Sequence, residues 1–406
     1  MTGDRSRTTY QAIVVGGGPA GSTTARLLAE AGCRVLLLDK AAFPRHKACS
    51  DYLNPAAVRV LRELGAMDAL WAAHPHPMQA MRVHAPGDRM FEATFRDVEP
   101  GHVALGITRH RLDDGLLQQA VAAGVEVRER AHVRDLVLDR GRVVGVQVTS
   151  GGVRETIRAP ITIGADGHHS VVSRRLELDV PVRWPRRTGL AAHFRGLDRL
   201  GDWGELHVTS GGYAGLALLE DGLATVTLVT NVDAVAQRAG SVESYYDEKL
   251  AEIPIVREMV ARSERVGPIR GVGPLARRVR RRTGDGYLLV GDAAGFLDPF
   301  TGEGIYKSLQ GARLAAPVIV AALERGDTSA RALAPYTRAY RRAFFANTQV
   351  LRIVQAFVHS PSLMSYVIDR LEQRAELGRL LTGVVSDLRP AQQALSPLFL
   401  ARLLRP

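Results

Sequence analysis

A glycine-rich run near the start of the chain, Gly16 to Gly21, has the spacing of a G-x-G-x-x-G turn. In such a turn the first glycine permits a sharp reversal, the second lets a pyrophosphate approach the backbone, and the third lets a helix pack closely on a strand. Asp39 ends the next apolar run, where a carboxylate can accept both hydroxyl hydrogens of an adenosine ribose. The pattern predicts a dinucleotide site, and its residues are Gly16, Gly18, Ala20, Gly21 and Asp39.

Two later glycine-rich segments extend this prediction to a longer ligand. The first is residues 163–167 (IGADG), and the second, residues 289–295 (LVGDAAG), leads into residues 299–305 (PFTGEGI). FAD needs contacts beyond its pyrophosphate, to a ribityl chain and a three-ring flavin. A carboxylate such as Asp292 suits the ribityl hydroxyls, and a glycine-rich turn before a helix presents N–H groups to the flavin edge that becomes negative on reduction. The sequence therefore predicts FAD rather than NAD.

These three motifs, in this order, resemble the flavoprotein superfamily of p-hydroxybenzoate hydroxylase and the geranylgeranyl reductases, over about residues 10–330. The resemblance implies an FAD-dependent oxidoreductase whose flavin is reduced by NADPH or NADH from a transient surface site. Arg109, in the segment RHRLD, matches the family's arginine near the cofactor. The residues expected around FAD, besides the first motif and Asp39, are Lys40, Arg45, Lys47, Arg109, Val133, Asp166, Gly167, Gly291, Asp292, Pro299, Gly302, Gly304 and Ile305.

Several segments bear on the branch of this superfamily. Gly295 and Glu303 stand where aromatic hydroxylases usually carry His and Gln, and residues 47–55 are similar to the Lys-Pro-Cys-Gly segment of geranylgeranyl reductases. Residues 212–218 (GYAGLAL), however, keep only Tyr213 of the Tyr-x-Trp-x-Phe-Pro usual in prenyl reductases. Loss of the bulky Trp and Phe should widen the pocket, which argues against a slender isoprenoid chain.

Our leading hypothesis from the sequence is a monooxygenase that hydroxylates an aromatic or polyketide-like small molecule. The first alternative is reduction of a C=C bond in a prenyl or lipid substrate. The second is an FAD protein that transfers electrons or binds a partner without turning over a small molecule. Halogenation is disfavoured, because the tryptophans, Trp71, Trp184 and Trp203, form no Trp-x-Trp pair.

Two side chains are candidates for contact with the substrate. Tyr213 is expected to present its hydroxyl to the substrate, and residues 49–52 to form the opposite wall. Cys49 is either a redox partner of the flavin or a small residue that lines its pocket, and the nearby Lys47 would favour its thiolate. No metal site is predicted, because His74 and His76 have no further ligands at metal-site spacing.

Charge and composition limit the partners. The 406 residues include 53 basic and 42 acidic side chains, which gives a net charge of +11. The arginines are spread along the chain without interleaved aromatic residues, so we expect no nucleic-acid partner. The excess charge is either a solvated surface or an attraction for a phosphate-bearing cofactor, an acidic carrier protein or a lipid surface. The densest run, Arg277 to Arg282, carries the same two interpretations.

Cysteine content and hydropathy bear on the compartment. Cys33 and Cys49 make no disulfide framework, which indicates a reducing compartment and a cytoplasmic protein. No apolar run is long enough to span a membrane, although residues 399–404 could lie on a lipid surface. The substrate is a small molecule, free or bound to a carrier protein, and the sequence leaves the oligomeric state open.

The elements that must position these residues follow from the hydrophobic pattern. Short apolar strands are predicted at 10–15, 34–38, 161–165 and 287–290, and helices at 22–31 and from 304 onward. We therefore predict an α/β fold: a doubly wound, Rossmann-type FAD-binding domain with an inserted antiparallel β-sheet substrate domain and a helical C-terminal region. The FAD domain would comprise residues 1–80, 101–182 and 276–330, the substrate domain 81–100 and 183–275, and the helical region 331–406.

Overall fold

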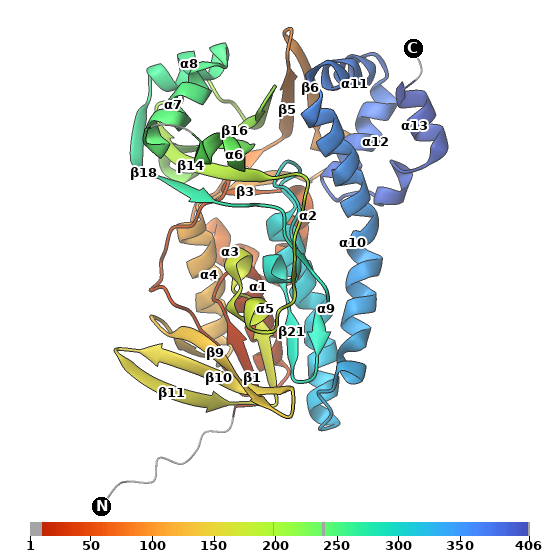
Figure 1. Ribbon diagram of the computed structural model, residues 1–406. Coiled ribbons are helices and arrows are strands. Elements are labelled where there is room, and N and C mark those ends of the chain that lie inside the picture. The colour runs from red at the N-terminus through yellow and green to blue at the C-terminus, as the bar shows by residue number, and fades with distance from the viewer. Residues whose placement is uncertain (1–9, 198, 238–239, 405–406) are drawn as a thin grey trace, which may run out of the picture.

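The computed structural model describes residues 10–404 except 198, 238 and 239 (Figure 1). Its centre is a six-stranded sheet in the order β20-β21-β12-β1-β2-β8, parallel except for the β20–β21 pair. Its strands are β1 (Ala12–Val15), β2 (Val35–Leu38), β8 (Glu126–Arg128), β12 (Ile161–Gly164), β20 (Thr283–Gly284) and β21 (Tyr287–Leu289). Every residue of β1, β2 and β12 is buried, as expected of parallel strands covered on both faces.

Helices cover one face of this sheet and a small antiparallel sheet covers the other. Helix α1 packs against α4 and α9, and β10 of the small sheet β11-β10-β9 contacts β12. The helices of this layer are α1 (Pro19–Glu30), α2 (Pro55–Glu63), α3 (Met67–Trp71), α4 (Arg109–Ala122) and α9 (Gly304–Glu324). Helix α5 (Val171–Arg175) instead contacts β9 and β12. The small sheet consists of β9 (His132–Asp139), β10 (Arg142–Ser150) and β11 (Val153–Arg158). The result is the doubly wound layer that the sequence predicts.

A second, seven-stranded sheet lies beyond the carboxyl ends of the parallel strands (Figure 1). Its order is β18-β14-β17-β16-β15-β5-β6. The strands are β5 (Ala80–Ala85), β6 (Arg89–Thr94), β14 (Arg187–Arg195), β15 (Trp203–Thr209), β16 (Gly212–Leu218), β17 (Leu223–Asn231) and β18 (Glu264–Val272). All neighbours are antiparallel except β5 and β15. The β5–β6 hairpin is the first part of the chain to enter this sheet, and β5 pairs in parallel with β15, which comes much later in the sequence.

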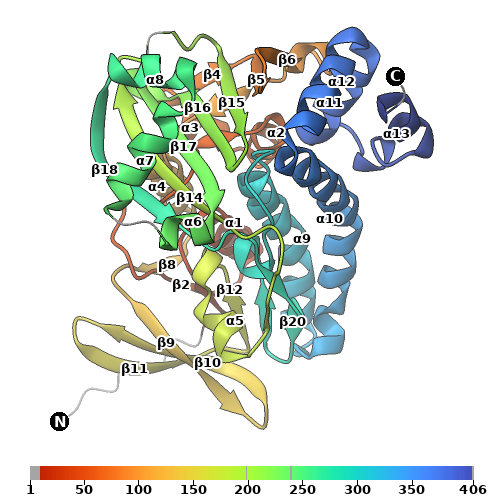
Figure 2. The ribbon, with the colours of Figure 1, turned by 45° about the horizontal axis from the view of Figure 1, so that its top comes forward.

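Helices flank this second sheet on both faces. Helices α7 (Val242–Ala251) and α8 (Pro254–Ala261) share one buried cluster with Leu190, Leu216 and Val226 of the sheet. Leu206, Tyr213 and Val229, on the opposite face, belong to a cluster with the C-terminal helices. These helices are α10 (Ala330–His359), α11 (Pro361–Gln373), α12 (Ala375–Val385) and α13 (Pro397–Leu404), and α11 contacts both β5 and β6 (Figure 2).

Helix α10 connects the two layers. It contacts β20 and α9 of the first layer and β16 of the second, and it runs along the whole side of the molecule in Figure 1. Smaller elements complete the described chain: β3 (Tyr52–Leu53), β4 (His76–Met78), β7 (Ala104–Gly106), β13 (Asp179–Val180), β19 (Arg278–Val279) and α6 (Val232–Ala236). Residues 1–9 and 405–406 of the predicted domains lie outside the described residues. Among the described helices, none combines the length and the apolar character that crossing a membrane requires.

Candidate active site

A cavity of about 270 Å³ lies between the two layers. Many of the residues singled out in the sequence line it, although they come from distant parts of the chain: Gly18, Ala20, Lys47, Cys49, Arg109, Gly167, Tyr213, Asp292, Pro299, Gly302, Gly304 and Ile305. The remaining predicted site residues do not line this cavity: Gly16, Gly21, Asp39, Lys40, Arg45, Val133, Asp166 and Gly291. The fold therefore brings all three glycine-rich motifs to one place.

The glycines of the first motif have different steric surroundings. Gly16 has φ of +103°, and a Cβ built on it would lie 2.5 Å from the Ala165 carbonyl oxygen. A Cβ on Gly21 would lie 1.8 Å from the Gly16 oxygen, so only glycine permits α1 to pack this closely. A Cβ on Gly18, by contrast, would meet no atom closer than 3.5 Å. The space beside Gly18, at the amino end of α1, is open to an anionic ligand.

Two guanidinium groups face this open turn. The Nη2 atoms of Arg45 and Arg109 would lie 3.5 and 3.7 Å from a Cβ on Gly18. Asp113, which has no exposed surface, accepts hydrogen bonds of 2.6 and 2.7 Å from Arg109 and lies 2.9 Å from Nη1 of Arg45. Burial lowers the pKa of Arg109, but the Asp113 carboxylate outweighs this effect and raises the pKa overall. A permanent, fixed positive charge beside the helix terminus fits a pyrophosphate.

Asp39 holds the same turn in place through hydrogen bonds to the backbone. One of its oxygens accepts a 2.6 Å hydrogen bond from the Gly17 N–H, and the other accepts a 2.8 Å bond from the Ala41 N–H. The carboxylate therefore fixes the glycine-rich turn, and a contact with ribose would use its remaining lone pairs. Lys40 is exposed beside it, and Val133, on β9, packs against the core of the first layer. Their contact with an adenosine stays a prediction.

The second and third motifs surround the middle of the cavity. Asp166 accepts a 2.6 Å hydrogen bond from the Val171 N–H, while its buried Oδ1 has no hydrogen-bond partner in the described chain. Lys47 reaches across, since its Nζ would lie 3.0 Å from a Cβ on Gly167. Burial, together with the charge of Arg109, lowers the pKa of Lys47. Asp292 supplies a carboxylate on the lining, as the contact with a ribityl chain requires.

The turn before α9 closes one side of the cavity. Gly302 has φ of +67°, its N–H donates a 2.9 Å hydrogen bond to the Pro299 oxygen, and a Cβ on it would lie 2.5 Å from the Tyr52 ring. The absence of a side chain lets Tyr52 pack against the turn, and α9 begins two residues later at Gly304. The cradle, the paired cations and the lining carboxylate fit FAD; when bound there, the flavin supplies hydride transfer that no side chain of the protein can provide.

Cys49 lines the cavity beside these residues, but not as a thiolate. Burial raises the pKa of its thiol, and the positive charge of Arg109 only partly opposes this effect. The expectation that Lys47 favours the thiolate is therefore wrong, because the thiol loses more solvation than the nearby cations restore. A neutral thiol is a proton donor rather than a nucleophile.

Tyr213 also lines the cavity, but its hydroxyl has another partner. It donates a 2.6 Å hydrogen bond to Asp298, which has no exposed surface and lies 3.7 Å from Arg187. Burial raises the pKa of Tyr213, so the hydroxyl keeps its proton. The bond to Asp298 holds β16 against the segment that follows the third motif, and the hydroxyl oxygen can still accept a hydrogen bond from a ligand. Contact of this hydroxyl with the substrate stays a prediction.

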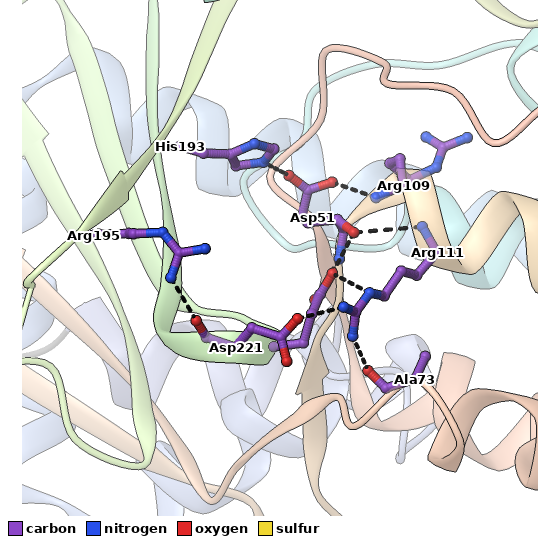
Figure 3. A network of polar contacts seen from close by, with 9 residues as sticks. Asp51, Ala73, Arg109, Arg111, His193, Arg195 and Asp221 are labelled. Atoms are coloured by element: carbon purple, nitrogen blue, oxygen red, sulfur yellow. Dashed lines mark hydrogen bonds and ion pairs between the residues drawn. The ribbon is translucent and has the colours of Figure 1, made fainter. Parts of the chain in front are cut away.

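Sequence reasoning missed a polar network beside Cys49 (Figure 3). Asp51, which is 2% exposed, accepts a 2.9 Å hydrogen bond from the Arg109 N–H and lies 2.7 Å from Nε2 of His193. Burial raises the pKa of Asp51, against the opposing hydrogen bond from His193. Arg111 extends the network to Asp221 and to the Ala73 oxygen. The start of α4, the Cys49 loop and the second sheet are thus fixed together.

The far part of the cavity is apolar. Its walls come from the second sheet and from α10, α11 and α12, and they include Met81, Val83, Phe91, Leu206, Phe357, Met364, Ile368, Leu371 and Leu381. Arg109 and Asp292 line the end near the glycine-rich turns, and the second sheet adds Glu205, Thr225 and Thr227 to the lining. The cavity can therefore hold a ligand with an apolar body whose reacting part lies near the glycine-rich turns.

The arginine run has a structural role in part. Arg277 donates a hydrogen bond to the His168 oxygen and lies 2.7 Å from Asp179, and Arg282 lies over the Tyr340 ring at 4.3 Å. Arg280 and Arg281 are exposed. The run is therefore neither a uniformly solvated loop nor a uniform cationic patch.

A doubly wound sheet, a glycine-rich turn with paired arginines and an adjoining substrate cavity define an FAD-dependent oxidoreductase. Comparison with known proteins gives the same class: the chain belongs to the FAD binding domain family, whose model matches residues 9–350. The prediction of FAD as cofactor is thereby confirmed.

Among curated proteins, the chain is similar to two digeranylgeranylglycerophospholipid reductases of Methanopyrus kandleri. Reductase 2 is 34% identical over 82% of this chain and 83% of its own length. Reductase 1 is 34% identical over 93% of this chain and 99% of its own.

Solved structures share the fold over nearly the whole chain. A flavoprotein/dehydrogenase from Cytophaga hutchinsonii has a TM-score of 0.83 at 20% identity and covers 93% of this chain and 92% of its own. The myxobacterial chondrochloren halogenase CndH has a TM-score of 0.80 at 27% identity, with 95% and 92% covered. A geranylgeranyl bacteriochlorophyll reductase-like protein from Thermoplasma acidophilum has a TM-score of 0.77 at 20% identity and covers 95% of this chain and 98% of its own.

Proposed function

We propose that this protein reduces C=C bonds of an isoprenoid or related lipid, with electrons taken from NADPH or NADH through bound FAD. The observation that carries the proposal is the 34% identity to digeranylgeranylglycerophospholipid reductase 1 over 93% of this chain. It favours the alternative drawn from the sequence over the leading hypothesis of a monooxygenase.

The character of the cavity supports a lipid substrate. Apolar side chains from β5, β6 and α10–α12 form its far part, and burial of apolar surface is the main source of affinity for a hydrocarbon chain. A Cβ built on Gly215 would lie 2.8 Å from Oγ1 of Thr227 and 3.3 Å from the Leu206 side chain, so neighbouring side chains take up part of the space that the GYAGLAL segment predicts. Residues from the C-terminal helices, which that segment does not reveal, bound this space on another side.

The reaction adds one hydride and one proton across the double bond, and the chain must supply the proton. Cys49 lies on the cavity lining, and burial keeps its thiol protonated at neutral pH. Arg109 and the backbone of Asp51 hydrogen-bond to the sulfur and stabilise the thiolate left after transfer. His193, bonded to Asp51, keeps this loop in place.

A reaction in the absence of oxygen tests the proposal. The purified FAD protein is reduced under argon and mixed with a lipid that carries geranylgeranyl chains, and the products are analysed by mass spectrometry. We expect reoxidation of the flavin and a product with two added hydrogens for each reduced bond. A product that gains an oxygen atom, and forms only in air, would establish the monooxygenase instead. Failure of any lipid or aromatic substrate to reoxidise the flavin would favour a protein without small-molecule turnover.

A further inference from the structure

We propose that His84, Glu205 and His207 form a binding site for a divalent transition metal, with Zn²⁺ as the expected ion. One possible ligand atom from each of the three lies within 4.8 Å of the others. Two imidazoles and one carboxylate are ligands that Zn²⁺ binds in proteins, with a fourth position left for water. None of the three is among the residues expected to contact FAD, although Glu205 also lines the cavity. The proposal does not depend on the proposed function.

The backbone brings the three ligands together. His84 of β5 and His207 of β15 are direct neighbours in the parallel pair, and Glu205 lies two residues before His207. Because side chains alternate along a strand, all three project from the same face, opposite the one that carries Leu206 and Val83. Two hydrogen-bonded strands are a rigid base for ligands that are distant in sequence. The sequence predicts no metal site, and the proposal departs from that expectation because His84 and His207 meet only through the pairing of β5 with β15.

An unpaired nitrogen points to a missing ligand. Nε2 of His84 is buried and has no hydrogen-bond partner in the described chain, whereas Nε2 of His207 lies 2.8 Å from Oε2 of Glu205. Buried polar atoms without a partner are rare in native proteins, and a water or an ion commonly satisfies them.

Surrounding contacts orient the carboxylate. The indole N–H of Trp203 donates a 3.0 Å hydrogen bond to Oε1 of Glu205. Oε2 is bonded to Nε2 of His207, and an ion would replace that contact by binding both atoms. Arg82 lies over the Trp203 ring at 3.6 Å and donates a 2.8 Å hydrogen bond to Glu92. Arg82, a positive charge near His84, is thus paired with another carboxylate. Supporting contacts of this kind are typical of the residues around metal ligands.

Metal binding requires one local movement. The two imidazole rings are stacked, with centroids 4.3 Å apart and planes 5° apart. Nitrogen lone pairs lie in the ring planes, so the rings must tilt before both can point at one ion. His84 is only half-buried, which gives its ring room to turn. The bound ion would link β5 to β15, at the only parallel pair of the described second sheet.

Zinc binding to the intact FAD protein tests the proposal. The protein is treated with a chelator, dialysed against increasing Zn²⁺, and assayed for bound zinc and for its melting temperature. We expect one Zn²⁺ per chain and a rise in melting temperature with zinc concentration, because the ion binds the folded state. His84→Ala should weaken this binding at least about tenfold. The matched control is His132→Ala, which removes a half-buried histidine of β9 and should bind zinc as the unaltered protein does.

Glu205→Gln provides a second variant that keeps the size of the side chain, and FAD content and circular dichroism report whether each variant is folded. Loss of the zinc-dependent rise in melting temperature in Glu205→Gln, with normal FAD content, would support the site. Absence of saturable zinc binding to the unaltered protein would overturn the proposal. Equal zinc binding by the His84 and Glu205 variants and the unaltered protein would do the same, because the ion would then be held elsewhere.

Discussion

Two glycines of the first motif should respond to the same substitution in opposite ways. A methyl group on Gly18 would have its nearest contacts at 3.5 and 3.7 Å, with the ends of two arginine side chains. We therefore expect Gly18→Ala to change the free energy of unfolding of the FAD-free protein by no more than about 0.5 kcal/mol. The same methyl would occupy the space through which a pyrophosphate reaches the backbone. FAD affinity should fall at least tenfold, or about 1.4 kcal/mol.

Gly21→Ala should act on the protein itself. The added carbon would lie 1.8 Å from the Gly16 oxygen and 3.1 Å from the Ala165 side chain, so α1 and the turn must move apart by roughly 1 Å. Backbone is displaced rather than a flexible side chain. We expect the free energy of unfolding to fall by at least about 3 kcal/mol, a large part of the roughly 5–15 kcal/mol that stabilises a typical domain.

The assay separates the two effects. Urea unfolding of both FAD-free variants gives their stabilities, and titration with FAD, followed by flavin fluorescence, gives their affinities. Unchanged FAD affinity in Gly18→Ala would refute the position that we assign to the pyrophosphate. Equal stability of Gly21→Ala and the unaltered protein would refute the close packing of α1 on the turn.

Three further predictions concern charged and titratable groups. Asp113→Asn removes the carboxylate shared by two arginines and should cost about 3–5 kcal/mol in urea unfolding, whereas the neighbouring, half-exposed Asp114→Asn should cost little. Cys49→Ser should slow anaerobic reoxidation of the reduced protein by substrate about 10²–10⁴-fold and leave the FAD content unchanged. The control Cys33→Ser should not slow this reaction. An equal rate in both variants would exclude Cys49 as the proton donor. Burial, with the charge of Glu303, raises the pKa of Asp387 from 3.8 to about 8. Since the folded state then holds a proton that the unfolded state releases, stability should fall as pH rises from about 4 to about 8, and Asp387→Asn should remove that part of the dependence in melting temperatures measured across this range.

The first layer could be predicted from the sequence because its determinants are local. The turn at Gly16–Gly21, the buried strands beside it and the helix that follows depend on glycine stereochemistry and on the hydrophobic pattern of adjacent residues. The predicted helix start at Ser22 is late, since α1 begins at Pro19. Proline is favourable in the first turn of a helix, where its missing N–H has no partner to lose. The end of the motif and the start of the helix therefore overlap.

Long-range pairs could not be predicted in the same way. His193 reaches Asp51 from β14, and no local pattern in either segment indicates the partner. The family motif marks Tyr213 as a residue that faces the substrate, but it does not show that the hydroxyl also donates a hydrogen bond to Asp298. Only the pairing of distant elements reveals that a polar side chain is already bonded. The sequence shows which side chains can form hydrogen bonds, but it does not show which distant residue each of them bonds.

The shape of the cavity also depends on elements that are distant in the sequence. This dependence explains why the cavity is compatible with lipid reduction rather than only with the monooxygenase that the sequence favours. The small side chains of residues 212–218 indicate a wide pocket, because one wall was considered alone. In the folded protein α11 and α12, near the carboxyl end, contact the β5–β6 hairpin and bring Met364, Ile368 and Leu381 to the cavity. Space that small side chains open at one wall can be filled by side chains from another wall, so a motif on a single strand cannot fix the cross-section of a pocket. Substitution of Ile368 or Leu381 should therefore change substrate preference as much as substitution within β16.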